Sequence, residues 1–320
     1  MHLDDLIRDE AILIRYIKKS IADSIDLVVD KCTGLGNIPQ EPDFVASLVI
    51  NFTPELLKIM QVVFPNYKFA LTGVFCHQKP LVNIGLSTNP EIGDLLFVYV
   101  DTDKNNITKL NSLLFQAKVT RTNSINIQNA FAHQLKLYSE WPDFEYKRAG
   151  VLNGVKRKIQ PKTLNDGAQY LLINPCSLYY PQRNVRRSRM GCSIPNKKLQ
   201  VNNDLAVEIL DFLKFKAGRA FEADPSISND DWTKMIWDIL NITKAKASKR
   251  KNSGIINFPR QMAAEFDGCC FISSEINSIY QDLHSEFSYW DSNNQNEIKF
   301  IDEDHISLSV IVIESNELIE

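Results

Sequence analysis

Two short apolar segments, close together in the sequence, constrain the fold of this 320-residue chain most strongly. The first is Leu95 to Val100 (LLFVYV), which lies between Gly93-Asp94 and the polar turn 101–109, and the second is Leu113 to Val119 (LLFQAKV). A continuous apolar run of this length is typical of a strand that is buried on both faces of a sheet. We therefore expect these two strands to pair as a hairpin in the middle of a sheet.

Helices and strands are expected to alternate around this hairpin. Apolar side chains at three- and four-residue steps predict helices, and alternating apolar side chains predict strands. The helices are expected at 1–31, 42–50, 53–64 and 125–138, the strands at 67–74 and 170–173, and after residue 174 three further helices at 205–221, 231–243 and 258–266 precede a late strand at 307–313. We expect an α/β protein in three parts: an N-terminal helical segment (1–40), a core with a mixed central sheet (41–175), and a mostly helical C-terminal extension (176–320).

Cysteine spacing and hydropathy exclude several classes of protein. The six cysteines include no Cys-x-x-Cys pair and no histidine at zinc-finger spacing, which argues against a structural zinc. Charged residues interrupt the first twenty positions, so the apolar core of a signal peptide is not expected there. No apolar stretch approaches the roughly 20 residues that span a bilayer. We expect a protein of the reducing cytoplasm that has no membrane partner.

Basic residues are concentrated in the middle of the chain. Between Lys104 and Asn203 there are 17 Lys and Arg residues but only four Asp and Glu residues, although the whole chain has a net charge of -3. A basic region within an acidic protein indicates a surface for a polyanion, because neutralised phosphates and released counterions supply most non-specific affinity for nucleic acid. The alternative is a solvated surface that the acidic flanks balance.

Polar residues interrupt the two apolar segments at positions suited to metal chemistry. Asp94 stands just before the first strand and offers a hard carboxylate ligand for Mg²⁺. Gln116 and Lys118 are two residues apart on the second strand, so both side chains leave the same face while Ala117 packs into the core. Gln116 could offer its carbonyl oxygen to the metal, and Lys118 could orient or deprotonate a water and stabilise negative charge at phosphorus.

The order of these elements and residues resembles the PD-(D/E)xK nuclease superfamily over residues 41–175. The resemblance implies a three-layer, restriction-endonuclease-like core that cuts nucleic acid, with duplex DNA as the expected substrate and Mg²⁺ or Mn²⁺ as the cofactor. The family usually has Asp or Glu where this chain has Gln116, although Mrr-like restriction enzymes share the glutamine. A neutral amide should bind a metal more weakly than a carboxylate. Proteins that combine such a core with an extension often act in restriction or bacteriophage defence.

A second match lies on the helix expected after Lys118. Gln134 and Tyr138 have the Q-x-x-x-Y spacing of the RecB-like branch, and four-residue spacing places both on one helix face. The resemblance implies that this face borders the metal site and the DNA. The alternative is that Tyr138 belongs to the core and Gln134 to the solvated surface.

The resemblance also implies one more acid on the helix before the sheet. Glu41, Asp43 and Glu55 all qualify, and Glu91 could complete the ligand set instead. We place Glu55 in the metal site together with Asp94 and Gln116 and leave the other three open. Glu55 is equally well explained as an acid in the first turn of a helix, where the helix dipole favours negative charge.

A cluster of arginines after residue 180 is a further candidate for contact with nucleic acid. Arg183, Arg186, Arg187 and Arg189 follow two tyrosines, a mixture suited to phosphate contact and base packing. A solvent-exposed loop explains the cluster equally well. The extension around it is expected to bind a partner protein or a second copy of the chain.

Two functions therefore compete for this sequence. The preferred one is a Mg²⁺-dependent endonuclease with Asp94, Gln116 and Lys118 at its catalytic centre. Its chief rival is a non-catalytic nucleic-acid-binding or scaffold protein on a degenerate nuclease fold, which the glutamine and the undecided acid would suit. A more distant rival is a protein-interaction module that has no polyanion partner.

Overall fold

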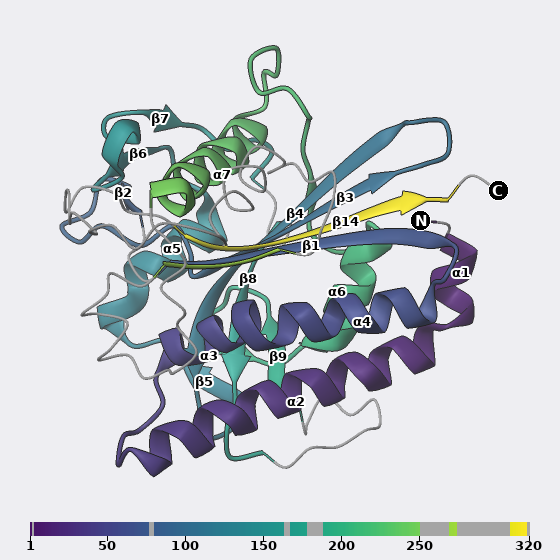
Figure 1. The fold of residues 1–320 in the computed structure, drawn as a ribbon. Coiled ribbons are helices and arrows are strands. Elements are labelled where there is room, and N and C mark those ends of the chain that lie inside the picture. The colour runs from purple at the N-terminus through teal and green to yellow at the C-terminus, as the bar shows by residue number, and fades with distance from the viewer. Residues whose placement is uncertain are drawn as a thin grey trace, which may run out of the picture.

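A mixed central sheet between two layers of helices forms the body of the molecule (Figure 1). The computed structural model describes residues 1, 3–76, 80–162, 167–177, 188–249, 269–273 and 308–318. The expected α/β class with a mixed sheet is confirmed. The helix expected at 258–266 lies outside the described residues.

The expected hairpin is the centre of this sheet. Strands β3 (Leu95–Thr102) and β4 (Thr108–Val119) pair antiparallel, and β8 (Ala168–Ile173) runs parallel to β4 on the far side. Leu96, Val98 and Leu114 face one core and Phe97 and Phe115 face the other, and all five are buried. Burial on both faces explains why these strands read as continuous apolar runs.

The chain returns to the middle of the sheet near its C-terminal end. Strand β14 (Ser309–Glu317) lies between β3, to which it is parallel, and β1 (Tyr67–Cys76), to which it is antiparallel. The strands at the edges are β13 (Cys269–Ser273) beyond β1, and β9 (Met190–Ser193) and β11 (Asn203–Asp204) beyond β8; the short β12 (Arg219–Ala220) pairs with β4. The described residues after 175 hold two of the expected helices, at 205–213 and 231–249, and they also supply several strands to the central sheet, which the sequence did not predict.

Long helices cover one face of the sheet. These are α1 (Leu3–Arg8), α2 (Glu10–Gly34), α3 (Glu41–Ser47), a π-helical turn (Leu48–Phe52), α4 (Thr53–Val63) and α6 (Leu205–Leu213). The two helices expected at 42–50 and 53–64 are one continuous helix, which the capping box between Gln40 and Asp43 starts. Residues 41–63 are long and apolar enough to cross a bilayer. Phe44, Phe52 and Leu56 are nevertheless fully buried, as in the core helix of a soluble protein.

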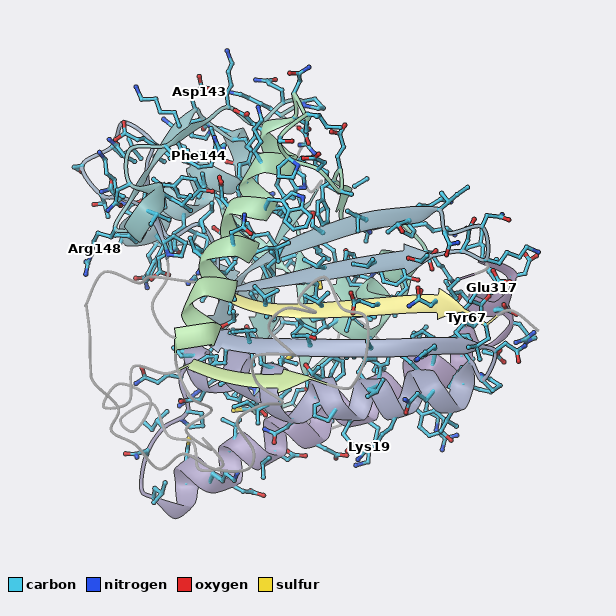
Figure 2. The ribbon with its side chains drawn as sticks, turned by 45° about the horizontal axis from the view of Figure 1, so that its top comes forward. Lys19, Tyr67, Asp143, Phe144, Arg148 and Glu317 are labelled. Carbon is cyan, nitrogen blue, oxygen red and sulfur yellow. The ribbon has the colours of Figure 1, made fainter. Side chains whose placement is uncertain are left out.

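Shorter elements cover the opposite face. Helices α5 (Ala132–Glu140) and α7 (Asp231–Lys249) pack there, together with 3-10 turns at Asn129–Phe131 and Gly150–Leu152, a small sheet of β2 (Leu81–Asn83), β6 (Phe144–Lys147) and β7 (Lys156–Arg157), and a pair formed by β5 (Ser124–Asn126) and β10 (Lys198–Gln200). Figure 2 shows α7 lying across the sheet and Arg148 at the outer margin of the small sheet. The helix expected at 125–138 starts only at residue 132, because residues 124–126 form β5.

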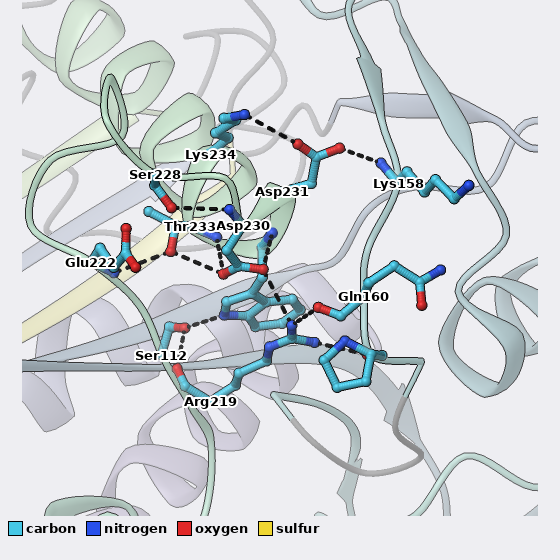
Figure 3. A network of polar contacts seen from close by, with 12 residues as sticks. Ser112, Lys158, Gln160, Arg219, Glu222, Ser228, Asp230, Asp231, Thr233 and Lys234 are labelled. Atoms are coloured by element: carbon cyan, nitrogen blue, oxygen red, sulfur yellow. Dashed lines mark hydrogen bonds and ion pairs between the residues drawn. The ribbon is translucent and has the colours of Figure 1, made fainter.

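A polar network fixes α7 on the sheet (Figure 3). Asp230 caps the helix by accepting a hydrogen bond of 2.9 Å from the Thr233 amide. The guanidinium of Arg219 pairs with Asp230 at 3.3 Å and lies 5.1 Å from the ring of Trp232. The indole of Trp232 in turn donates to Ser112 on β4 at 2.9 Å. Gly167 adjoins this network with φ +82°, and a Cβ there would lie 2.4 Å from the Trp232 ring, so only glycine fits.

Candidate functional site

The register of the β3–β4 hairpin brings Asp94 and Gln116 together. Leu95 pairs with Phe115, so the preceding Asp94 falls opposite Gln116, and the Asp94 amide donates to the Phe115 carbonyl at 2.7 Å. The Gln116 carboxamide donates a hydrogen bond to Oδ2 of Asp94. The Ala117 amide donates to the same oxygen at 2.6 Å. The two expected metal ligands are thus direct neighbours at the start of β3.

Lys118 lies on the same face of β4 as Gln116. Both side chains are nearly buried, with 6% of Lys118 and 2% of Gln116 exposed, and Ala117 is fully buried on the opposite face. The Lys118 ammonium lies 3.4 Å from Oε2 of Glu41, and the Val119 amide donates to the other carboxylate oxygen at 3.4 Å. Glu41 opens helix α3, so the start of that helix reaches the end of β4.

Glu41 therefore takes the place in the candidate site that the sequence assigned to Glu55. Glu55 stands 14 residues further along the same continuous helix, which is about 21 Å at a rise of 1.5 Å per residue. Its carboxylate is half exposed and pairs with Lys58 at 2.7 Å. The expectation that Glu55 binds the metal was wrong. Asp43 is also occupied, because its carboxylate accepts the Gln40 amide at 2.7 Å.

Two buried amide oxygens at this end of the sheet have no hydrogen-bond partner among the described residues. They are Oε1 of Gln116 and Oε1 of Gln134. A buried acceptor that lacks a donor costs about 1–3 kcal/mol, so such atoms point to a group that binds them. The free oxygen of Gln116 lies on the side chain that already contacts Asp94.

The donor set fits a hard cation that keeps part of its hydration shell. Asp94 and the open oxygen of Gln116 are oxygen donors, the type that Mg²⁺ prefers, and Glu41 lies beside Lys118. The described ranges hold no group of three His, Cys, Asp or Glu side chains arranged as metal ligands. A Mg²⁺ ion bound here would take one or two carboxylates from the protein and the rest of its ligands from water and substrate phosphate.

Tyr138 supports the site from the core. Its hydroxyl donates to the Ile92 carbonyl at 2.9 Å, and its ring stacks on Trp141 with centroids 5.8 Å apart. Burial, and next the charge of Asp94, raise the pKa of Tyr138 well above its ordinary value. A Cβ on Gly93 would lie 2.9 Å from this hydroxyl, so glycine allows the close approach. The expected contact of Tyr138 with nucleic acid was wrong, because only 1% of the side chain is exposed.

Helix α5 and the turn before it also approach the ends of the strands. The Lys118 ammonium lies 5.0 Å from the centroid of the Phe131 ring, and 40% of Phe131 is exposed. Gln134 follows at a three-residue step and is 8% exposed. Burial, and next the charge of Lys118, lower the pKa of His133. The sequence missed Phe131 and His133; their position just before the Q-x-x-x-Y motif was the available signal.

The arginine cluster divides between a structural residue and residues outside the described ranges. Arg189 is buried, and its guanidinium donates to Asp26 at 2.7 Å and to the Ala22 carbonyl at 3.2 Å. It fastens helix α2 to the start of β9, so the expected contact with nucleic acid was wrong. Arg183, Arg186 and Arg187 lie outside the described residues.

Comparisons of this chain with protein-family models, with curated proteins and with solved structures gave no match.

Proposed function

We propose that this chain is a metal-dependent nuclease that hydrolyses phosphodiester bonds of duplex DNA. The observation that carries the proposal is the convergence of Asp94, Gln116, Lys118 and Glu41 at one end of β3 and β4. Three of these side chains come from the pattern that resembles PD-(D/E)xK nucleases, and the fourth supplies an acid from the preceding helix. A restriction or bacteriophage-defence role, a cytoplasmic location and a partner bound through the residues after 175 stay predictions.

The four side chains divide the work of hydrolysis. Asp94 and the free oxygen of Gln116 would hold Mg²⁺ or Mn²⁺, which supplies Lewis-acid stabilisation of the phosphate and lowers the pKa of a bound water. The Lys118 ammonium donates hydrogen bonds to the attacking water and to a non-bridging phosphate oxygen. Glu41, at 3.4 Å, fixes the position of that ammonium. Low exposure of Asp94, Gln116 and Lys118 strengthens these electrostatic contacts.

The proposal is tested with Asp94→Asn and Lys118→Gln. Plasmid is incubated with each variant in Mg²⁺, Mn²⁺ or EDTA, and nicking and gel retardation are both measured. We expect the rate of nicking to fall about 100-fold or more in both variants while retardation persists, because general acid–base groups contribute about 10²–10⁴ to rate. Lys109→Gln is the matched control, since Lys109 is exposed near the other end of the same strand. Retained nicking in both site variants would refute the assignment.

A non-catalytic nucleic-acid-binding protein is the second candidate. The observation that favours it is the hydrogen bond from Gln116 to Asp94, which satisfies part of the carboxylate without a metal. Such a protein retards plasmid equally in Mg²⁺, Mn²⁺ and EDTA and never nicks it. The same gel therefore separates the two candidates.

A further inference from the structure

A small basic sheet lies directly beside the candidate site. Strands β5 and β10 pair antiparallel, with Lys198 opposite Asn126, and the Ile127 amide donates to the Lys197 carbonyl at 2.8 Å. Arg121 lies in the turn that leads from Lys118 into β5. We call the surface formed by Arg121, Lys197 and Lys198 the β5–β10 surface.

The three cations of the β5–β10 surface are exposed and have no acid beside them in sequence. Their side chains form no ion pair with any residue that the structure describes. The segments 119–139 and 188–203, which contain them, hold no Asp and no Glu at all. An uncompensated positive field on one small sheet attracts a polyanion.

Some lysines elsewhere in the molecule are instead paired with acids. Lys147 pairs with Glu145, Lys58 with Glu55 at 2.7 Å and Lys162 with Asp143 at 3.9 Å. These cations are neutralised locally, so they add little to the field at long range.

The β5–β10 surface is within reach of the residues that would cut. Arg121 is three residues beyond Lys118, so their Cα atoms lie within about 11 Å of one another. Ile127, whose amide bonds to Lys197 just before β10, is four residues before Phe131, whose ring lies 5.0 Å from the Lys118 ammonium. Figure 1 shows β5, α3 and α5 at the same end of the central sheet. A strand of nucleic acid bound across this surface would place a phosphate near Lys118.

We propose that the phosphate backbone of duplex DNA docks on the β5–β10 surface, with Arg121, Lys197 and Lys198 each contacting a phosphate. This inference rests on the proposed function, because it assigns the substrate its place beside that site. The exposed amides of Asn126 and Gln128 add neutral donors of the kind that position a backbone without reading sequence. Phe131 marks the border between the docking surface and the candidate site.

The test measures binding and does not depend on cleavage. The triple variant Arg121→Gln, Lys197→Gln, Lys198→Gln is made in the Asp94→Asn chain, and its affinity for a 30-base-pair DNA duplex is measured in EDTA from about 50 to 200 mM salt by fluorescence anisotropy. The logarithm of the association constant falls linearly with the logarithm of the salt concentration. Each lost phosphate contact makes this slope shallower by about 0.9, so we expect the triple variant to have a slope shallower by about 2–3. The single variant Arg121→Gln should lower it by about 1.

The matched control removes three exposed lysines from the opposite end of the sheet. Lys68, Lys104 and Lys109 lie near the start of β1 and the tip of the β3–β4 hairpin, where Figure 2 marks Tyr67 and Glu317. Changing all three to Gln alters the net charge by the same amount and should leave the slope within about 0.5 of the parent.

Equal losses in the two triple variants would overturn the docking surface, as would an unchanged slope in the β5–β10 triple. Tighter binding of an RNA duplex of the same sequence would overturn the choice of DNA. Thermal unfolding of each variant identifies one that has not folded, and the Arg121→Gln result then decides. If the β5–β10 triple leaves the salt slope unchanged while the parent chain nicks plasmid and Asp94→Asn does not, only the surface is contradicted. If the triple makes the slope shallower as expected but Asp94→Asn still nicks plasmid, only the proposed active site is contradicted.

Discussion

Strand β3 carries a buried aspartate at each end, and the two are held in different ways. Asp101, at the end of the strand, contacts the α-ammonium of Met1 and accepts a hydrogen bond of 2.6 Å from Ser315. The Ser315 hydroxyl also bonds to Tyr99 at 2.8 Å, which closes the group. Asp94, just before the strand, receives hydrogen bonds from two amide groups, the Gln116 side chain and the Ala117 backbone.

The difference between the two ends separates a stabilising cluster from a candidate binding site. At the Asp101 end, the Met1 ammonium and the Ser315 hydroxyl both bind the Asp101 carboxylate. At the Asp94 end, the buried oxygens of Gln116 and Gln134 accept no hydrogen bond from the described residues. A buried acceptor that stays open calls for an explanation, and a bound water or ion is one. The three predictions below test this contrast between the two ends.

The largest expected effect on stability comes from removing charge at the Asp101 end. Asp101→Asn leaves the part-buried Met1 ammonium without its carboxylate, so the free energy of unfolding should fall by about 1.5–3 kcal/mol. Asp94→Asn is the matched change, and it should alter that free energy by less than about 1 kcal/mol. The new amide can donate to Oε1 of Gln116 once the Gln116 carboxamide turns over. Urea unfolding in EDTA measures the free energy of unfolding of both variants. Equal losses of stability in the two variants would contradict the difference between the two ends of β3.

A smaller effect, on activity alone, separates the two acids of the long helix. Glu41→Gln should lower the nicking rate about 10- to 100-fold, because the groups that orient a metal-site residue typically contribute that much. Glu55→Gln removes the same charge about 21 Å along the same helix and should leave the rate unchanged. Nicking at saturating Mg²⁺ is the measurement. A loss in Glu55→Gln with none in Glu41→Gln would restore the assignment made from sequence.

The smallest effect is a pH dependence at the Asp94 end. Because the folded state lowers the pKa of His133, the unfolded chain binds more protons below the ordinary value of 6.5, and His133 destabilises the fold as the pH falls. In His133→Gln the stability should therefore decline less between pH 7 and pH 5. Urea unfolding at pH 5, 6 and 7 tests this. In Lys118→Gln, an NMR titration should give a His133 pKa closer to its ordinary value, and no rise would contradict the influence of Lys118.

The parts of the site that depend on local sequence were predictable. The lengths of the two apolar runs and the turn between them set the hairpin, and residue alternation put Gln116 and Lys118 on one face. The neighbouring positions of Asp94 and Gln116 then follow from the antiparallel register. These inferences need only the geometry of one hairpin.

The parts that depend on distant contacts were not predictable from one sequence. Glu41 and Glu55 both adjoin a proline, and the sequence placed both near the start of an expected helix, so local signals favour neither. The basic character of Arg189 suggested phosphate contact, but its partner is Asp26, which is 163 residues away in the chain. The apolar sequence of residues 307–313 predicted a strand, but nothing in it indicates that β1 and β3 are its neighbours.

The insertion of β14 has a consequence for the order in which the molecule is completed during synthesis. Strand β3 has its final neighbour on only one side until residues 309–317 have left the ribosome, because β14 fills the gap between β3 and β1. A nascent chain that already contains Asp94, Gln116 and Lys118 therefore still has two open strand edges in its central sheet. We expect a chain truncated after residue 249 to aggregate and to lack the proposed activity, because the edges of β3 and β1 stay open.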